Sequence, residues 1–203
     1  MSETENEMFQ TISSEPLYYI GRLIVSMNTI LIRLLEPGDI QPISAAFAEL
    51  GWNKPVSQYE EYLLEQQAGA RVVLVACLNG EFAGYITIGW QSHYLPFRTA
   101  NIPELVDFNV LPRFRRLGIG TKLMDEAEQR AAAVSSMVGI GVGMTADYGP
   151  AQRMYAQRGY IPDGRGLLYE GYQVIYGKLI TVDDDLCMYF TKKLAPILPA
   201  GLS

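Results

Sequence analysis

The sequence predicts one α/β (α+β) domain in which helices pack against a central sheet. Strand-like and helix-like segments alternate from residue 29 onward. Asn79-Gly80 separates two β-rich segments and is a strong hairpin signal. A length of 203 residues predicts one domain with an appendage, and a hydrophobic content of 49% is enough for one full core. We therefore expect a single domain over residues 29–203 and an N-terminal extension over residues 1–28.

The first half of the expected domain contains a strand, two helices and a hairpin. Pro37-Gly38-Asp39 ends the first strand, and Asp39 can cap the next helix. Apolar residues then recur at helical spacing, with Gly51 as a stop signal. The expected elements are a strand at Ile30–Leu35, helices near residues 43–50 and 57–63, and strands at Arg71–Leu78 and Glu81–Trp90.

The second half begins with an irregular stretch, Gln91–Pro103, and continues with three strand regions and two helices. A strand at Met137–Met144 carries glycine at alternate positions, Gly139, Gly141 and Gly143, which predicts a close approach by backbone or ligand on that face. The other expected elements are a strand at Glu104–Val110, a helix at Thr121–Val134, a short helix between Pro150 and Gly159, and strands near Tyr160, Val174 and Leu186–Thr191.

Composition and charge argue against several classes of partner. Sixteen basic and 22 acidic residues give a formal net charge of −6, so no overall positive field attracts nucleic acid or anionic lipid. No apolar run is long enough to span a bilayer. Cys77 and Cys187 are far apart in apolar runs, which predicts packed thiols and a reducing, cytoplasmic location. We expect no metal, and we interpret Asp183-Asp184-Asp185 as a solvated turn.

The N-terminal extension does not resemble a signal peptide. Residues 1–16 contain four glutamates and no lysine or arginine, the reverse of a signal-peptide start. The apolar segment Tyr18–Met27 is interrupted by Arg22, and it either extends from the domain or packs on it as a helix or strand. A second hypothesis is that translation starts at Met27.

A loop rich in arginine and glycine connects the Glu104–Val110 strand to the following helix. The first amide groups of a helix lack intrahelical acceptors and can hold a phosphate. Gly118 and Gly120 allow close approach of the backbone, and Arg113, Arg115 and Arg116 add positive charge. A dinucleotide fingerprint would need a small residue where Leu123 stands, and the Gly-Lys-Ser/Thr of a P-loop is absent. What remains is an Arg-x-x-Gly-x-Gly motif.

This motif, Arg115 to Gly120, resembles the acetyl-CoA pyrophosphate loop of the GNAT acetyltransferase superfamily. A second segment, Ala151 to Tyr160, resembles the family's later signature, in which a tyrosine and a glycine-aromatic pair follow the fifth strand. The order of the predicted elements also matches, so the resemblance covers about residues 29–194. One departure is Tyr148, which stands where the family often has asparagine.

The resemblance implies a mixed, mostly antiparallel sheet whose fourth and fifth strands splay apart to admit acetyl-CoA as cosubstrate. The backbone of Phe108, Asn109 and Val110 would bond the pantetheine arm, and the amide ending the fourth strand could polarise the thioester carbonyl. The pyrophosphate would be held by Arg115, Arg116, Leu117, Gly118, Ile119, Gly120 and Thr121.

The resemblance also implies candidate catalytic groups. Glu104 stands eleven residues before Arg115, where some members carry a glutamate base; the alternative is a residue that only begins a strand at the surface. Asp107 is a weaker candidate because strand alternation would point it to the opposite face from Glu104. Tyr155 occupies the position of the acid that protonates the leaving thiolate, an alternative being a core tyrosine. No cysteine lies in these motifs, so direct attack by an amine is favoured.

The acceptor is less well defined by the sequence. Trp90 and Tyr94 lie where the family often forms a wall of the acceptor pocket, and His93 is expected at the surface. The leading hypothesis is acetyl transfer to a primary amine, either a small molecule or a peptide. The alternative is a CoA-binding sensor or scaffold without turnover, which thiol release across an amine panel would distinguish. Transfer of a longer acyl group and assembly as a homodimer stay open.

Overall fold

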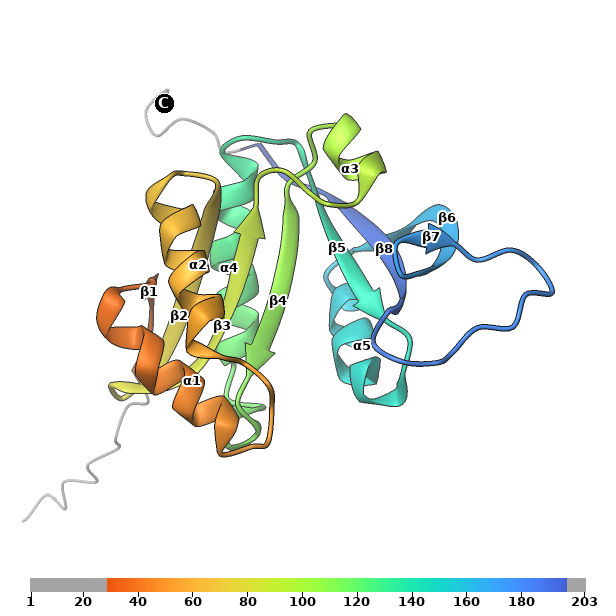
Figure 1. Cartoon of the computed structure of the whole chain (residues 1–203). Helices are drawn as coiled ribbons and strands as arrows, with labels where there is room; N and C mark the ends of the chain where they lie inside the picture. Colours follow the sequence, from red (N-terminus) through yellow and green to blue (C-terminus); the bar gives the residue numbers. More distant parts are fainter. Residues whose placement is uncertain (1–28, 197–203) are drawn as a thin grey trace, which may run out of the picture.

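The computed structural model describes residues 29–196, in which eight strands form one sheet (Figure 1). The hypotheses about residues 1–28, including the start at Met27, lie outside the described residues. The strand order is β1-β2-β3-β4-β5-β8-β6-β7. All neighbouring strands are antiparallel except β4 and β5, which confirms the mixed, mostly antiparallel sheet.

The element bounds agree with the expected order. The strands are β1 Ile30–Leu34, β2 Arg71–Leu78, β3 Glu81–Gly89, β4 Glu104–Val110, β5 Met137–Gly143, β6 Ile161–Tyr169, β7 Tyr172–Gln173 and β8 Leu186–Lys193. The α-helices are α1 Ile40–Ala48, α2 Val56–Gln67, α3 Leu95–Thr99, α4 Ile119–Ala132 and α5 Gly149–Gln157. Short 3₁₀ turns are η1 Pro37–Asp39, η2 Pro112–Phe114 and η3 Ala146–Tyr148.

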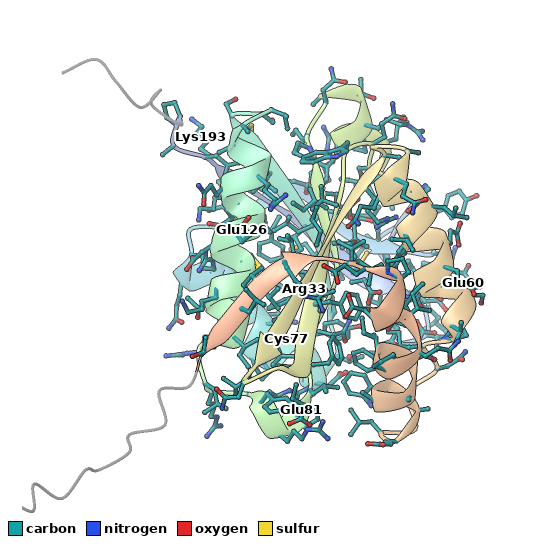
Figure 2. All side chains as sticks on the ribbon, turned by 90° about the vertical axis from the view of Figure 1, so that its left-hand side faces the viewer. Arg33, Glu60, Cys77, Glu81, Glu126 and Lys193 are labelled. Atoms are coloured by element: carbon teal, nitrogen blue, oxygen red, sulfur yellow. The ribbon has the colours of Figure 1, made fainter. Side chains whose placement is uncertain are left out.

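The first four strands form a continuous antiparallel ladder between two helical layers. The turn Asn79-Gly80 has positive φ at both residues, 52° and 87°, as a tight hairpin between twisted strands requires. In Figure 2 the sheet is seen from its β1 edge, with Glu60 on the α2 side and Glu126 on the α4 side. Both faces of β2 and β3 are therefore covered, and most of their side chains are buried.

β4 and β5 pair over only two residues. Glu104 opposes Gly139 and Leu105 opposes Ile140, and no further pair joins the two described strands. From there the strands diverge toward their carboxyl ends (Figure 1). The predicted splay between the fourth and fifth strands is therefore present.

One α-helix, α3, was not predicted from the sequence. The stretch Gln91–Pro103, expected to be irregular, contains α3. This helix begins at Leu95 and has Pro96 in its first turn. Phe97 turns inward from this helix and is 2% exposed. The helix is only five residues long, so periodicity could not reveal it.

The described residues contain no helix long and apolar enough to cross a membrane. Between residues 29 and 196, no three acidic, histidine or cysteine side chains gather as metal ligands would. Cys77 is buried and Cys187 half-buried, and both are free thiols. The Asp183–Asp185 segment is part of a turn in which Asp183 accepts hydrogen bonds from the Tyr169 hydroxyl and from the Asp185 amide.

Candidate functional site

The loop between β4 and α4 presents free amide groups at the start of a long helix. Arg116 has φ of 63° and Gly118 has φ of 81°, so the chain makes a sharp turn before Ile119 begins the helix. No side chain caps this helix. Its first amides, at the positive end of the helix dipole, are therefore available to an anion.

The arginines of this loop have different partners. Arg113 pairs with Glu81 and lies over the Phe114 ring, whereas the Arg115 Nε donates to the Val110 carbonyl at 3.1 Å. Arg116 is exposed and makes no ion pair with any residue between 29 and 196. Of the three arginines, Arg116 is thus the most available to a ligand.

The diverging edge of β4 offers backbone groups to an extended ligand. The Leu111 amide donates to Ala83 on β3 at 2.9 Å. Since successive residues of a strand direct their backbone groups to opposite edges, Val110 and Phe108 face the gap toward β5. By the same alternation Asn109, which opposes Tyr85, faces β3. Two of the three residues expected to bond a pantetheine arm are therefore oriented to do so.

Gly120, at the start of α4, lies against the Phe108 side chain of β4. A Cβ there would lie 3.1 Å from the Phe108 ring, closer than ordinary packing allows. A larger residue would need the Phe108 ring to shift by a few tenths of an ångström. The arrangement suits a long ligand with an anionic end, held by α4, and a polar arm that runs along β4.

Glu104 lies at the point where β4 and β5 separate. Its side chain is buried, with the residue 8% exposed, which excludes the alternative of a surface residue. Ser92 Oγ donates to Glu104 Oε2, and the Tyr94 amide donates to the same Ser92 oxygen at 2.9 Å. Burial raises the pKa of Glu104 despite the Ser92 hydrogen bond, so its carboxylate is a stronger base than an exposed one.

Tyr155 lies on α5 and belongs to the main hydrophobic core. It is 5% exposed and its ring packs against Tyr160, with centroids 5.8 Å apart. Among the described residues no hydrogen bond ends on its hydroxyl. Burial and the nearby Tyr148 phenol raise the pKa of Tyr155, so the hydroxyl keeps its proton at neutral pH. Core packing and proton donation are both compatible with this position.

Comparison with known proteins identifies the family. The model of the acetyltransferase (GNAT) family matches residues 40–160. The chain belongs to the GNAT acetyltransferase family. An uncharacterized N-acetyltransferase of Archaeoglobus fulgidus is 32% identical over 106 residues, which cover 52% of this chain and 69% of that one. As a family member the protein is an acetyltransferase enzyme.

Solved structures of similar proteins share the fold. An N-acetyltransferase from Staphylococcus aureus Mu50 has a TM-score of 0.62 at 16% identity, covering 82% of this chain and 99% of that one. A Salmonella typhimurium protein, solved with its cofactor acetyl-CoA, has a TM-score of 0.60 at 18% identity, covering 83% and 95%. At these identities the likeness concerns the arrangement of the GNAT sheet and helices.

The glycine face of β5 is covered by aromatic side chains of this acetyltransferase itself. A Cβ at Gly139 would overlap the Phe97 ring, and one at Gly143 would lie 2.6 Å from the Tyr148 ring. Tyr189 covers Gly141 in the same way, at 3.1 Å. A close approach is present, but aromatic side chains make it, and not the backbone or ligand that the glycines predicted. Tyr148, the departure from the family pattern, thus fills space above the end of β5.

The residues expected to line the acceptor pocket are only partly exposed. Tyr94 is 8% exposed, stacks on Tyr189 with centroids 3.7 Å apart, and donates to Asp163 at 2.6 Å. Trp90 is half-buried against the main core, and His93 is exposed as expected. Tyr94 therefore supports the aromatic cover of β5, and Trp90 keeps a free part of its surface.

Asp107 lies on the same face of the sheet as Glu104, which corrects the expectation from alternation. β4 contains a bulge, because Asp107 and its successor together oppose Ile86. Asp107 has φ of 53° there. Its carboxylate turns toward Tyr85, on the face of β3 shared by Gly89, the partner of Glu104. The bulge thus brings both carboxylates to one face.

Proposed function

We propose that this GNAT enzyme transfers an acetyl group from acetyl-CoA to a primary amine by direct attack within a ternary complex. The observation that carries the proposal is the divergence of β4 and β5 directly beside the uncapped start of α4. The gap has a polar strand edge on one side and a helix dipole at its end. These features fit an acyl-CoA, whose arm is polar and whose diphosphate is anionic.

Binding would use the backbone more than side chains. We assign the diphosphate to the amides of Gly118 to Thr121 with Arg116 beside them, and the pantetheine arm to the gap-facing backbone of Phe108 and the Val110 amide. Acetyl-CoA brings the thioester whose acyl carbon the amine attacks. Arg115 would act on the loop, since its contact with the Val110 carbonyl ties the loop to the strand.

Two side chains would move the protons. An alkylammonium has a pKa of about 10.4 and must lose a proton before it attacks. Glu104, with a raised pKa at the base of the gap, is suited to accept that proton directly or through water. Tyr155, on α5, is suited to protonate the departing thiolate. Attack forms the N–C bond, the C–S bond breaks, and CoA leaves as the thiol.

The test is release of the CoA thiol from acetyl-CoA across a panel of primary amines, measured by a thiol-reactive dye. Release that depends on the amine, with acetylated amine detected by mass spectrometry, supports the proposal. Binding of CoA by calorimetry without amine-dependent release would replace it with a sensor or scaffold. Longer acyl-CoA thioesters in the same assay define the acyl preference.

Replacing Tyr155 by phenylalanine tests the acid. We expect turnover to fall by about a hundredfold, the usual size of a general-acid contribution, with CoA affinity unchanged. Tyr160→Phe is the matched control, because the Tyr160 hydroxyl is buried without a partner in the described structure. Unchanged turnover in Tyr155→Phe would remove the acid role.

We further propose a cytoplasmic location, supported by the two free thiols of Cys77 and Cys187. We also propose that one catalytic domain extends over residues 29–203, after an extension of residues 1–28. Gel filtration and limited proteolysis of the full chain test the domain boundary and the homodimer together.

A further inference from the structure

The carboxylate of Asp107 accepts five hydrogen bonds from side chains. The Oδ2 atom accepts from the Tyr85 hydroxyl at 2.5 Å, the Gln58 amide at 2.8 Å and the Tyr62 hydroxyl at 3.0 Å. The Oδ1 atom accepts from the Asn109 amide at 2.8 Å and from the Lys54 ammonium. Five donors therefore fix this carboxylate, and φ of 53° at Asp107 lies in the left-handed region that aspartate adopts more readily than most residues.

The place of this carboxylate links it to the reaction. Asp107 is two residues beyond Leu105, the last residue of β4 that pairs with β5, so it lies at the start of the divergence. It also shares a face with Glu104, the proposed base. Burial is the first cause of the raised pKa of Tyr148, in the turn after β5, and the Asp107 charge adds a smaller contribution.

The group that neutralises Asp107 is itself a primary ammonium. Lys54 comes from the loop between α1 and α2, and its side chain is 21% exposed against 11% for Asp107. The Tyr85 ring lies 6.0 Å from the Lys54 nitrogen, close enough for a weak cation–π attraction. The Asp107 carboxylate therefore already binds an alkylammonium at one oxygen, with two phenol hydroxyls at the other.

We propose that Asp107 binds the ammonium group of the acceptor and that Lys54 is an internal competitor for that position. The inference rests on the proposed function and names its substrate class, alkylammonium compounds. An acceptor amine replaces Lys54 with a chemically equivalent group, so the buried carboxylate never loses its counter-charge. Lys54, on a surface loop, regains its hydration when displaced.

The phenols distinguish this site from a simple surface ion pair. Burial and the Asp107 charge raise the pKa of both Tyr62 and Tyr85, so both remain donors at neutral pH. With Gln58 they occupy Oδ2 and leave Oδ1 as the position for an ammonium. Neutral alcohols, which bring no charge, would leave Asp107 unpaired and be rejected.

The experiment measures binding of n-butylamine hydrochloride to the full chain in the presence of saturating CoA, which cannot donate an acetyl group. The variants are Lys54→Met, which keeps the aliphatic stem, and Lys178→Met, a control on an exposed loop lysine. We expect Lys54→Met to bind the amine about tenfold more tightly than wild type and Lys178→Met to match wild type. The isosteric neutral probe, 1-butanol, should not bind to any of them.

Asp107→Asn in the Lys54→Met background should abolish the gain. Equal affinity in wild type and Lys54→Met, equal binding of 1-butanol, or an undiminished affinity in the double variant would each overturn the proposal. If the double variant does not fold, as judged by CoA binding and circular dichroism, the first two comparisons still decide.

Kinetics separate this inference from the proposed function. With n-butylamine as acceptor, Lys54→Met should lower the amine KM about tenfold and leave the acetyl-CoA KM unchanged. If no variant releases thiol but the binding pattern holds, the ammonium site stands and the transfer reaction fails. If thiol is released while Lys54→Met alters neither amine KM nor amine affinity, the transfer reaction stands and the ammonium site fails.

Discussion

The two halves of the sheet differ in how firmly they are built. β2 and β3 have helices on both faces, and from Val73 to Leu78 every side chain is buried. In the second half, β6 and β7 are largely exposed, with Ile161 64% and Tyr172 79% accessible. Only two residue pairs join the halves through the sheet. The site therefore lies where a stiff half, with β2 and β3 buried on both faces, meets a half whose outer strands are exposed.

Ionic contacts also join the two halves of the molecule, in addition to the two residue pairs between β4 and β5. Glu128 on α4 accepts hydrogen bonds from Arg158, directly after α5, and from Lys192 on β8, at 2.9 and 2.6 Å. Arg158 also reaches Asp125 at 2.6 Å. These bonds tie α5, which carries Tyr155, to α4, whose start we propose binds the diphosphate. These ion pairs add to the apolar packing of β5, whose Val138, Ile140 and Val142 are buried in the main core.

The largest expected effect breaks the join between the halves. Gly139→Val would place a branched side chain where the Phe97 ring lies, at the residue that pairs with Glu104. We expect a loss of about 3 kcal/mol in unfolding free energy, at the upper end for overpacking a core. Urea denaturation measures it, and Gly149→Ala is the control because a Cβ there meets nothing within 4 Å. Equal stability of the Gly139→Val variant and wild type would contradict the packing described.

A smaller effect comes from removing the ionic tie. Glu128→Ala leaves Arg158 and Lys192 without their shared partner and should cost about 2 kcal/mol at neutral pH. Glu126→Ala, which removes an exposed pair with Arg130, is the control and should cost under about 0.5 kcal/mol.

The Glu128 effect should also depend on pH. Burial alone would raise the pKa of Glu128, but the hydrogen bonds from Arg158 and Lys192 bring it below its ordinary value of 4.5. Its stabilisation is then fully present above pH 4.5 and is lost as the pH falls through the lower, folded-state pKa. A difference between Glu128→Ala and wild type that stays constant from neutral pH to acid would argue against the ion pairs.

The smallest expected change in stability comes from replacing Glu104, at the site between the two halves. Because burial raises the pKa of Glu104, the folded protein holds that proton more tightly than the unfolded chain. The ionised carboxylate therefore costs stability once the pH rises above 4.5, its ordinary pKa. We expect Glu104→Gln to melt at a higher temperature than wild type near pH 8 and at the same temperature near pH 4. The same variant should turn over about a hundredfold more slowly if Glu104 is the base.

A gain in stability with no loss of turnover would leave Glu104 buried but uninvolved in proton transfer. Loss of stability at pH 8 would mean that the carboxylate is held by contacts stronger than the Ser92 hydrogen bond. Thermal melts at several pH values, followed by thiol-release kinetics, separate these cases.

Local signals predicted the stiff half well. Asn79-Gly80 defines its hairpin through a local φ requirement, and the Arg-x-x-Gly-x-Gly loop is recognisable because its chemistry lies in consecutive residues. The family resemblance then gave the splay and the place of Glu104 and Tyr155. These features need no knowledge of distant contacts.

The features that could not be predicted depend on partners far apart in the chain. The bulge at Asp107 is a mismatch between β4 and β3, so alternation along β4 alone assigned the wrong face. The Ser92 hydrogen bond to Glu104 and the ring of Phe97 over Gly139 come from the α3 region, whose five-residue helix has no periodic signature. The donors to Asp107 are 22 to 53 residues away, apart from Asn109.

The position of β8 has a consequence for how the protein is made. β8 is the last strand in the chain, yet it lies between β5 and β6 and pairs with both. During synthesis the residues of β1 to β4 can form their ladder early, whereas β5 and β6 have no strand between them until Leu186–Lys193 has left the ribosome. A nascent chain at that stage carries the unpaired edges of β5 and β6, which is the form most exposed to aggregation.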